Sequence, residues 1–98
     1  MPEKREEYVV GQLRLRRTDL QWRAVEGEIV ALDVRGSQYL GVNDSGAQLW
    51  DLLAAGTTRA ALAEHLSATY GLDPATAGAH AEAFVDQLRA QDLVEESD

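Results

Sequence analysis

The stretch covering residues 27–53 constrains the fold most, because its apolar period changes from two to about 3.6 without an intervening linker. Residues 28–34 alternate like a β-strand and place two sets of side chains on opposite faces: Val30, Leu32 and Val34, and Ile29, Ala31 and Asp33. This alternation puts Asp33 on the outer face. Arg35-Gly36 is a predicted tight turn, since glycine suits the positive φ that hairpins need. Residues 37–42 then resume the alternation, which predicts a β-hairpin.

A helix follows this hairpin directly. Asn43 or Asp44 is the predicted cap, because a short polar side chain accepts a free backbone N–H of the first turn. Apolar side chains then recur at offsets of three and four, at Leu49, Trp50, Leu52 and Leu53. Gly56 suits the left-handed conformation that commonly ends a helix.

Further elements flank this unit on both sides. Residues 9–16 alternate weakly and predict a short strand, and Leu20–Val25 alternates more clearly before a second tight turn at Glu26-Gly27. Strands joined by such short turns pair antiparallel, because a parallel pair needs a long crossover. Thr57 or Thr58 begins a second predicted helix, which ends at Tyr70-Gly71.

Asp73-Pro74 starts a third predicted helix, with aspartate as the cap and proline at the first position, and this helix runs to about Gln91. Its predicted apolar stripe is Ala77, Ala81, Phe84 and Leu88. The predicted fold class is α+β, winged-helix-like, with a three-stranded antiparallel sheet followed by three helices. Residues 1–19 are interpreted as a tail with a possible short strand, 20–95 as one domain, and 96–98 as a tail.

Composition argues against several classes of protein. Of the net charge of −8, the whole excess lies in residues 36–98, where ten acidic residues face only Arg59 and Arg89. Such a surface repels nucleic acid, whose binding depends on lysine and arginine. Cysteine is absent, the first residues lack the apolar core of a signal peptide, and no apolar run is long enough for a membrane span. We expect a cytoplasmic protein that binds neither nucleic acid nor membrane.

Catalytic and metal-binding patterns are not evident. His65 and His80 fall on different predicted helices without acidic or histidine partners at ligand spacing, so we interpret them as partly buried helix residues. The serine of Asp44-Ser45-Gly46 is better explained by helix capping than by nucleophilic catalysis. We therefore expect no enzyme, no cofactor and no metal.

The strand Ser37–Val42 is the last of the predicted sheet, so one side of its backbone is unpaired unless another segment covers it. Proteins blunt such edges with charge or proline, and this strand has neither. The alanine-rich third helix leaves shallow relief beside it. This combination favours strand addition by an extended peptide. Coverage by the chain's own N-terminus or by a homodimer mate remains open.

Three segments carry a family resemblance: YLGVNDSGAQLWDLLAAGTT, LAEHLSATYGLD and FVDQLRAQDLVE. Together they resemble the PqqD-like family, named for coenzyme PQQ synthesis protein D, over about residues 20–95. The resemblance implies a RiPP recognition element, which binds the leader segment of a ribosomally made precursor peptide. In that family the leader adds as a strand beside the third strand and lies against the third helix. Two departures are Asp92, where the family often has glycine, and Gly41, which replaces a larger residue.

A free-standing domain of this length looks most like the recognition protein of lasso-peptide biosynthesis, a peptide chaperone that works with a separate leader peptidase and cyclase in the maturation of natural products such as antibiotics. One alternative is a PQQ-type chaperone that delivers its peptide to a radical-SAM enzyme. Another is a winged-helix DNA-binding regulator, which the acidic third helix disfavours. The expected peptide-binding residues are Ser37, Gln38, Tyr39, Leu40, Gly41, Val42, Ala81, Glu82, Val85, Leu88 and Arg89.

Val85 and Arg89 are included because they lie one turn apart on a flank of the predicted Phe84 and Leu88 stripe, where they would face a bound strand. An unoccupied edge also predicts a weak homodimer of the peptide-free protein, which leader peptide would dissolve.

Overall fold

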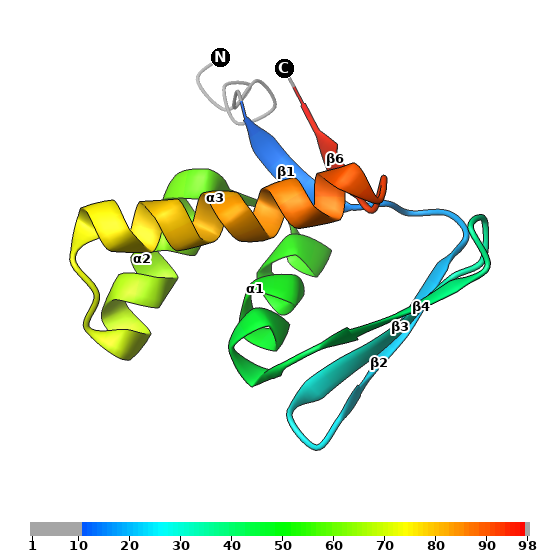
Figure 1. Cartoon of the computed structure of the whole chain (residues 1–98). Helices are drawn as coiled ribbons and strands as arrows, with labels where there is room; N and C mark the ends of the chain where they lie inside the picture. The colour runs from blue at the N-terminus through cyan, green and yellow to red at the C-terminus, as the bar shows by residue number, and fades with distance from the viewer. Residues whose placement is uncertain (1–10, 98) are drawn as a thin grey trace, which may run out of the picture.

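A computed structural model describes residues 11–97 of the chain (Figure 1). The elements are β1 (Gln12–Leu15), β2 (Leu20–Val25), β3 (Glu28–Asp33), β4 (Gln38–Val42), α1 (Asp44–Ala55), β5 (Thr57–Thr58), α2 (Arg59–Tyr70), α3 (Pro74–Ala90) and β6 (Val94–Glu96). The predicted α+β class is confirmed, with a three-stranded antiparallel sheet, β2-β3-β4, followed by three helices. The first ten residues, including the start of the expected strand at residues 9–16, and Asp98 lie outside the described residues.

The two hairpin turns of this sheet differ in backbone conformation. Between β2 and β3, Glu26 and Gly27 both have positive φ, 53° and 83°, as a two-residue type I′ turn requires. Between β3 and β4 the positive φ of 56° falls on Ser37 rather than on Gly36. Gly36 is small for another reason: a Cβ there would lie 2.8 Å from Oδ2 of Asp33, whose Oδ1 accepts the Gly36 N–H. The expected two-residue turn at Arg35-Gly36 is therefore wrong.

A second small sheet, β5-β1-β6, was not predicted. β1 pairs antiparallel with both neighbours, with Leu13 opposite Thr57 and Leu15 opposite Val94. Glu96, which is predicted from the sequence to lie in a tail, is part of this pairing. Strands of two and three residues are too short to show a period, which is why the sequence does not reveal them.

Helix ends follow local side-chain chemistry. The side chains of Asn43, Thr58 and Asp73 each accept a backbone N–H in the first turn of α1, α2 and α3, respectively. Gly56, with φ of 96°, and Gly71, with φ of 69°, end α1 and α2. The positions of these caps fall within the sequence predictions, but only Gly71 has the left-handed helical conformation, since the ψ of 126° at Gly56 lies outside it.

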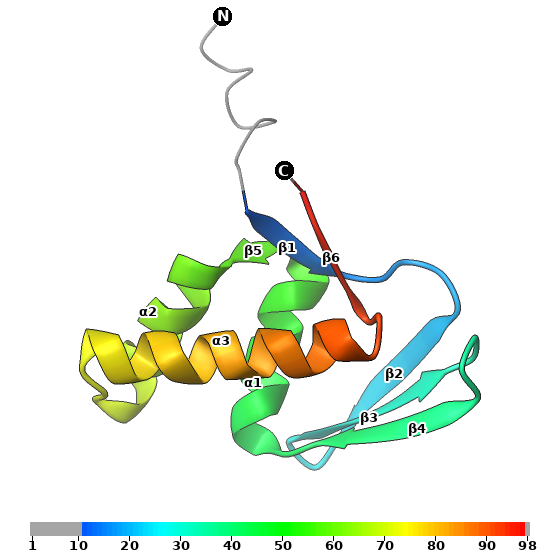
Figure 2. The ribbon, with the colours of Figure 1, turned by 45° about the horizontal axis from the view of Figure 1, so that its top comes forward.

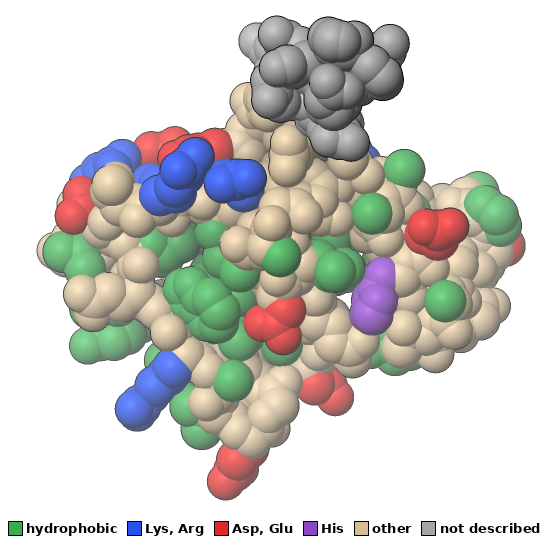
Figure 3. Space-filling view, turned by 180° about the vertical axis from the view of Figure 1, so that it is seen from behind, with side chains coloured by type: hydrophobic (Ala, Val, Ile, Leu, Met, Phe, Trp, Pro, Cys, Tyr) green, Lys and Arg blue, Asp and Glu red, His purple; other side chains and the backbone are tan. Residues whose placement is uncertain are grey.

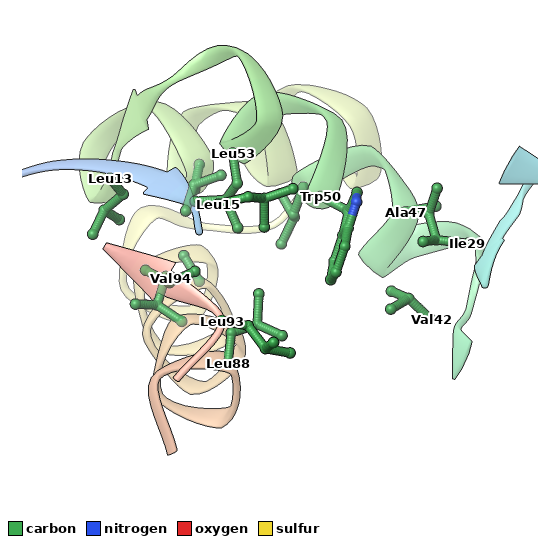
Figure 4. Close-up of a cluster of buried hydrophobic side chains, with 14 of the residues drawn as sticks. Leu13, Leu15, Ile29, Val42, Ala47, Trp50, Leu53, Leu88, Leu93 and Val94 are labelled. Atoms are coloured by element: carbon green, nitrogen blue, oxygen red, sulfur yellow. The ribbon is translucent and has the colours of Figure 1, made fainter. Parts of the chain in front are cut away.

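The core gathers around α1, with Trp50 at its centre and fully buried (Figure 4). Ile29 and Ala31 of β3 point into this core, each 1% exposed, whereas Val30 is 43% exposed. The face of β3 that carries Asp33 is therefore the inner face, and the expectation that Asp33 points outward is wrong. Alternation defines two faces but does not say which is buried when both carry apolar residues.

Buried Arg16 gives Asp33 its partner on this inner face. Its guanidinium lies 2.6 Å from Oδ1 of Asp33 and also donates to the carbonyls of Thr18, Asp19 and Asp92. The hydrogen bond from Arg16 is the main cause that holds the pKa of the Asp33 carboxyl below its usual value. Arg16 thus ties the end of the three-stranded sheet to the turn between α3 and β6.

Candidate functional site: a groove between the sheet edge and the third helix

A groove of about 600 Å³ lies between β4 and α3, over the N-terminal part of α1. Figures 1 and 2 show α3 crossing in front of α1 while β4 runs into the start of α1. The end of β4 and the start of α1 contribute Leu40, Gly41, Val42, Asn43, Ser45, Gly46 and Leu49. α3 contributes His80, Phe84, Gln87, Leu88 and Gln91, and the end near α2 is formed by Leu66, Tyr70 and Leu72.

The groove lining contains no Asp, Glu, Lys or Arg side chain, although the chain has a net charge of −8. Leu40, Val42, Leu49, Phe84 and Leu88 are among its apolar lining residues, and the polar residues His80, Gln87 and Gln91 lie on the α3 side. An uncharged cleft of this kind favours a ligand that contributes apolar side chains and backbone hydrogen bonds.

The outer edge of β4 supplies backbone groups for such bonds. Within residues 11–97, β4 pairs only with β3. Val34 donates its N–H to Asp19 on the β2 side, so the alternation of backbone groups turns the N–H groups of residues 29, 31 and 33 toward β4. Their partners in register are Val42, Leu40 and Gln38. The intervening residues, Tyr39 and Gly41, therefore direct their N–H and C=O groups away from β3, to the open edge.

Gly46 in the first turn of α1 brings three elements close together. A Cβ at this position would lie 2.6 Å from Cγ1 of Val42 and 3.1 Å from Cε1 of Phe84. The absence of a side chain therefore lets β4, α1 and α3 meet at the bottom of the groove. From the sequence, this glycine is predicted only as part of a helix cap.

The structure separates the predicted residues of the third strand into two groups. Leu40, Gly41 and Val42 line the groove. Ser37 lies in the turn before β4, while Gln38 and Tyr39 are on the strand, with the Tyr39 side chain 79% exposed. Since Leu40 and Val42 face the core side, Tyr39 projects from the opposite face and contributes its backbone rather than its side chain to the edge.

Four of the α3 residues predicted to bind the peptide lie outside the groove lining. Ala81 and Val85 are 1% and 0% exposed in the core, and Glu82 and Arg89 lie beyond them, outside the groove lining. Of the predicted helix residues only Leu88 lines the groove. An apolar stripe has two flanks, and Val85 extends the stripe toward α2 and β6 instead of toward β4.

An ion-pair cluster occupies that other flank. Arg59 lies 2.7 Å from Oε2 of Glu82 and 2.6 Å from Oε2 of Glu96, and Arg89 lies 2.9 Å from Oε1 of Glu96. Hydrogen bonding to Arg59 lowers the pKa of Glu96, and bonding to Glu96 raises the pKa of Arg59. Glu82 and Arg89 thus join α2, α3 and β6 through ion pairs.

The polar flank of α3 is absent from the residues predicted from the sequence. His80, Phe84, Gln87 and Gln91 recur at offsets of four, seven and eleven, so they share one face of the helix. His80 is exposed there, in contrast to the expected partly buried residue, whereas His65 is half-buried with Nε2 2.7 Å from Oε1 of Gln48. The spacing of these four residues is visible in the sequence. Because three of them are polar, however, the sequence does not distinguish them from residues that face the solvent.

Neither a metal-binding cluster nor a membrane-spanning helix is found within residues 11–97. This part of the chain brings together no group of three or more His, Cys, Asp or Glu side chains suited to a metal ion. None of its helices combines the length and the apolar character that crossing a bilayer requires.

The fold and the groove define a class of small α+β domain in which an open sheet edge lies beside a helix. The family model of coenzyme PQQ synthesis protein D (PqqD) matches residues 28–94, and this chain belongs to that family. No match to a curated protein sequence was found.

Two solved structures are similar to this chain. One is described as TbiB1 in complex with the TbiA(beta) leader peptide; it has a TM-score of 0.78 and 21% identity, over 87% of this chain and 98% of that chain. The other is lasso peptide synthetase B1 complexed with the leader peptide, with a TM-score of 0.74 and 25% identity, over 85% and 96% of the two chains. Both similarities extend over nearly the whole described domain.

Proposed function

We propose that this chain binds the leader segment of a ribosomally made precursor peptide by strand addition to β4, and acts as a non-catalytic adaptor for the enzymes that modify the peptide. The observation that carries this proposal is the pair of outward-directed backbone positions, Tyr39 and Gly41, beside an uncharged groove. An added strand bonds to these positions and places alternate side chains between β4 and α3.

The energetics require both parts of the site. Each backbone hydrogen bond contributes about 0.5–1.5 kcal/mol net, so the few bonds that Tyr39 and Gly41 make give only weak binding by themselves. Burial of an apolar leader side chain against Phe84 and Leu88 adds about 1.5–3 kcal/mol for a residue of leucine size. The backbone bonds thus set the direction and register of the leader, and the groove selects its side chains.

The comparisons support this function. Two proteins with this fold were solved with leader peptides, one of them described as a lasso peptide synthetase B1. We propose the same class of ligand for this chain, and a leader peptidase and a cyclase as the enzymes that receive the bound precursor. We also propose that the domain works in the cytoplasm and without a cofactor.

A second candidate function rests on the family match to coenzyme PQQ synthesis protein D. In this alternative the bound peptide is the precursor of PQQ, and the receiving enzyme belongs to the radical-SAM class. Both candidates use the same edge and groove, so they differ in the peptide and not in the site. Titration with a lasso-type leader and with a PQQ precursor peptide distinguishes them, because only one should bind tightly.

The site itself is tested by a matched pair of charge substitutions on α3. Gln87→Glu introduces a carboxylate into the groove lining, while Ala79→Glu introduces one at an exposed position of the same helix outside the lining. We expect Gln87→Glu to weaken binding of a fluorescently labelled leader about tenfold or more, because a carboxylate desolvated beside apolar side chains is costly. Ala79→Glu should bind like the wild type.

Equal affinities of the two variants for a leader that binds the wild type would contradict the groove. A wild-type protein that binds neither class of precursor peptide, but shifts duplex DNA at moderate salt, would instead support the winged-helix regulator. The exposed acids Glu82 and Asp86 on α3 disfavour that result.

A further inference from the structure

The three-stranded sheet has a second open edge, formed by β2. Within residues 11–97, β2 pairs only with β3. Because Val34 donates to Asp19, backbone alternation turns the N–H groups of residues 21, 23 and 25 toward β3. The N–H and C=O groups of Leu20, Trp22 and Ala24 are therefore directed outward. This edge lies on the opposite side of the sheet from the proposed leader site on β4.

The β2 edge carries one charged residue, Arg23, and otherwise lacks the features that normally prevent strand pairing. Leu20–Val25 is six residues long and has neither proline nor lysine. Trp22 packs edge-on against Trp50, with ring centroids 6.0 Å apart, but remains 40% exposed. Val25 is 39% exposed. Seen from behind, the molecule shows hydrophobic side chains at the surface where the sheet meets the helices (Figure 3).

A second copy of this chain fits the edge in one favoured register. In a two-fold antiparallel pair, the outward residues must face one another, and two registers overlap five residues of each strand. One register places Arg23 directly opposite its symmetry mate, which like-charge repulsion disfavours. The other places Trp22 opposite Trp22, Leu20 opposite Ala24, and Gln21 opposite Arg23. No like charges oppose each other in this second register, and large and small side chains alternate.

We propose that this protein forms a weak symmetric homodimer through β2, in which two sheets join into one of six strands centred on Trp22. The contact area of five residues from each strand is small, which favours a reversible dimer over a permanent one. The β4 edge of each protomer stays free, so the dimer can carry two leaders. This proposal concerns a different edge from the proposed function, and either can fail without the other.

Substitutions at Gln21 test the register because their expected effects oppose those of net charge. Gln21 is exposed and faces Arg23 of the second copy in a non-hydrogen-bonded pair, where side chains lie closest. Gln21→Glu makes the chain more acidic yet adds two attractive pairs per dimer. Gln21→Arg makes it less acidic yet adds two repulsive pairs. Ala68→Glu and Ala68→Arg, at an exposed position of α2, are the controls for net charge.

Sedimentation velocity from about 10 µM to about 1 mM measures the dimer dissociation constant of each full-length variant. We expect Gln21→Glu to lower it and Gln21→Arg to raise it, each about 2–30-fold, because two cross-strand pairs change together. The Ala68 variants should shift slightly in the opposite sense, since they change only the net repulsion. Amide exchange at Trp22 should slow as concentration rises.

A wild-type protein that remains monomeric over this range would overturn the proposal. It would also be overturned if the Gln21 variants followed the Ala68 variants, because the association would then depend on net charge. Slowed amide exchange at Tyr39 and Gly41, with unchanged exchange at Trp22, would assign the contact to β4 and would equally refute the β2 dimer.

Discussion

Replacement of Gly46 by alanine separates the effect of the groove geometry from the effect of helix propensity. Alanine is the better helix former, and by propensity alone Gly46→Ala gains up to about 1 kcal/mol. In the structure, however, the new Cβ lies 2.6 Å from Cγ1 of Val42 and 3.1 Å from Cε1 of Phe84. Val42 is buried, so the contact is relieved only if the end of β4 or the start of α1 moves.

The expected magnitude follows from the two opposing effects. Overpacking of a close-packed site costs about 1–3 kcal/mol, so the net result is a loss of about 0–2 kcal/mol in the free energy of unfolding. Gly78→Ala is the matched control, because Gly78 lies in α3 and a Cβ there meets no atom within 4 Å. We expect Gly78→Ala to stabilise the domain by about 0.5–1 kcal/mol.

Urea denaturation followed by far-ultraviolet circular dichroism measures both variants, and a difference of about 1–3 kcal/mol between them is expected. In thermal melts, each kcal/mol corresponds to about 4–8 °C for a domain of this size. Gly46→Ala should also weaken leader binding, because Val42 and Phe84 line the groove. Equal stabilisation by the two alanines, with unchanged leader affinity, would refute the close approach at Gly46.

The other predictions concern the buried core, one ion pair and one helix cap. Val85→Asp should lower the free energy of unfolding by more than about 3 kcal/mol in urea titrations, because Val85 is fully buried. A variant that stays folded and loses only leader binding would show that Val85 contacts the leader and does not belong to the core. Pairing with Arg16 lowers the pKa of Asp33 from 3.8, so the pair contributes stability above pH 3.8 and this contribution is lost as the pH falls through the folded-state pKa. Asp33→Asn should therefore be less stable at pH 7, and its free energy of unfolding should decrease less than that of the wild type as the pH is lowered. An equal decrease in both proteins would argue against the pairing. Thr58→Ala should cost about 1 kcal/mol by loss of the α2 cap, measured by the urea midpoint, and no change would contradict the Ala61 N–H bond.

Local chemistry made much of the fold predictable from the sequence. Helix boundaries depend on single side chains, and Asn43, Thr58 and Asp73 cap the helices where the sequence predicts. The β2–β3 turn is similarly determined by Glu26-Gly27. These features involve residues close in the chain, so one sequence suffices to find them.

Features that depend on distant partners were harder to predict. Ile29 and Val30 are equally suitable core residues, and only the position of α1 decides that Ile29 is buried. The flank of α3 that lines the groove is decided in the same way, because ion pairs with α2 and β6 occupy the side of Glu82 and Arg89 and leave the side of Gln87 to the groove. β5 and β6 are strands only because they pair with β1, which is distant from both in the sequence.

The edge positions depend both on the local sequence pattern and on contacts with residues distant in the chain. The unprotected strand is visible in the sequence, but the residues that turn their amides outward are not. That assignment follows from the bond between Val34 and Asp19 and from the register of β3 with β4. The same bond assigns the outward positions on β2, which the sequence did not single out.

Residue-resolved amide hydrogen exchange, with and without a bound leader peptide, tests strand addition to β4 most directly. At a concentration where the protein is monomeric, the amides of Tyr39 and Gly41 should exchange fast in the free protein and become strongly protected when the leader is added. Leu40 and Val42 should be protected in both states, since they bond to β3. Protection of Tyr39 and Gly41 in the free monomer, or no change on leader binding, would contradict the account.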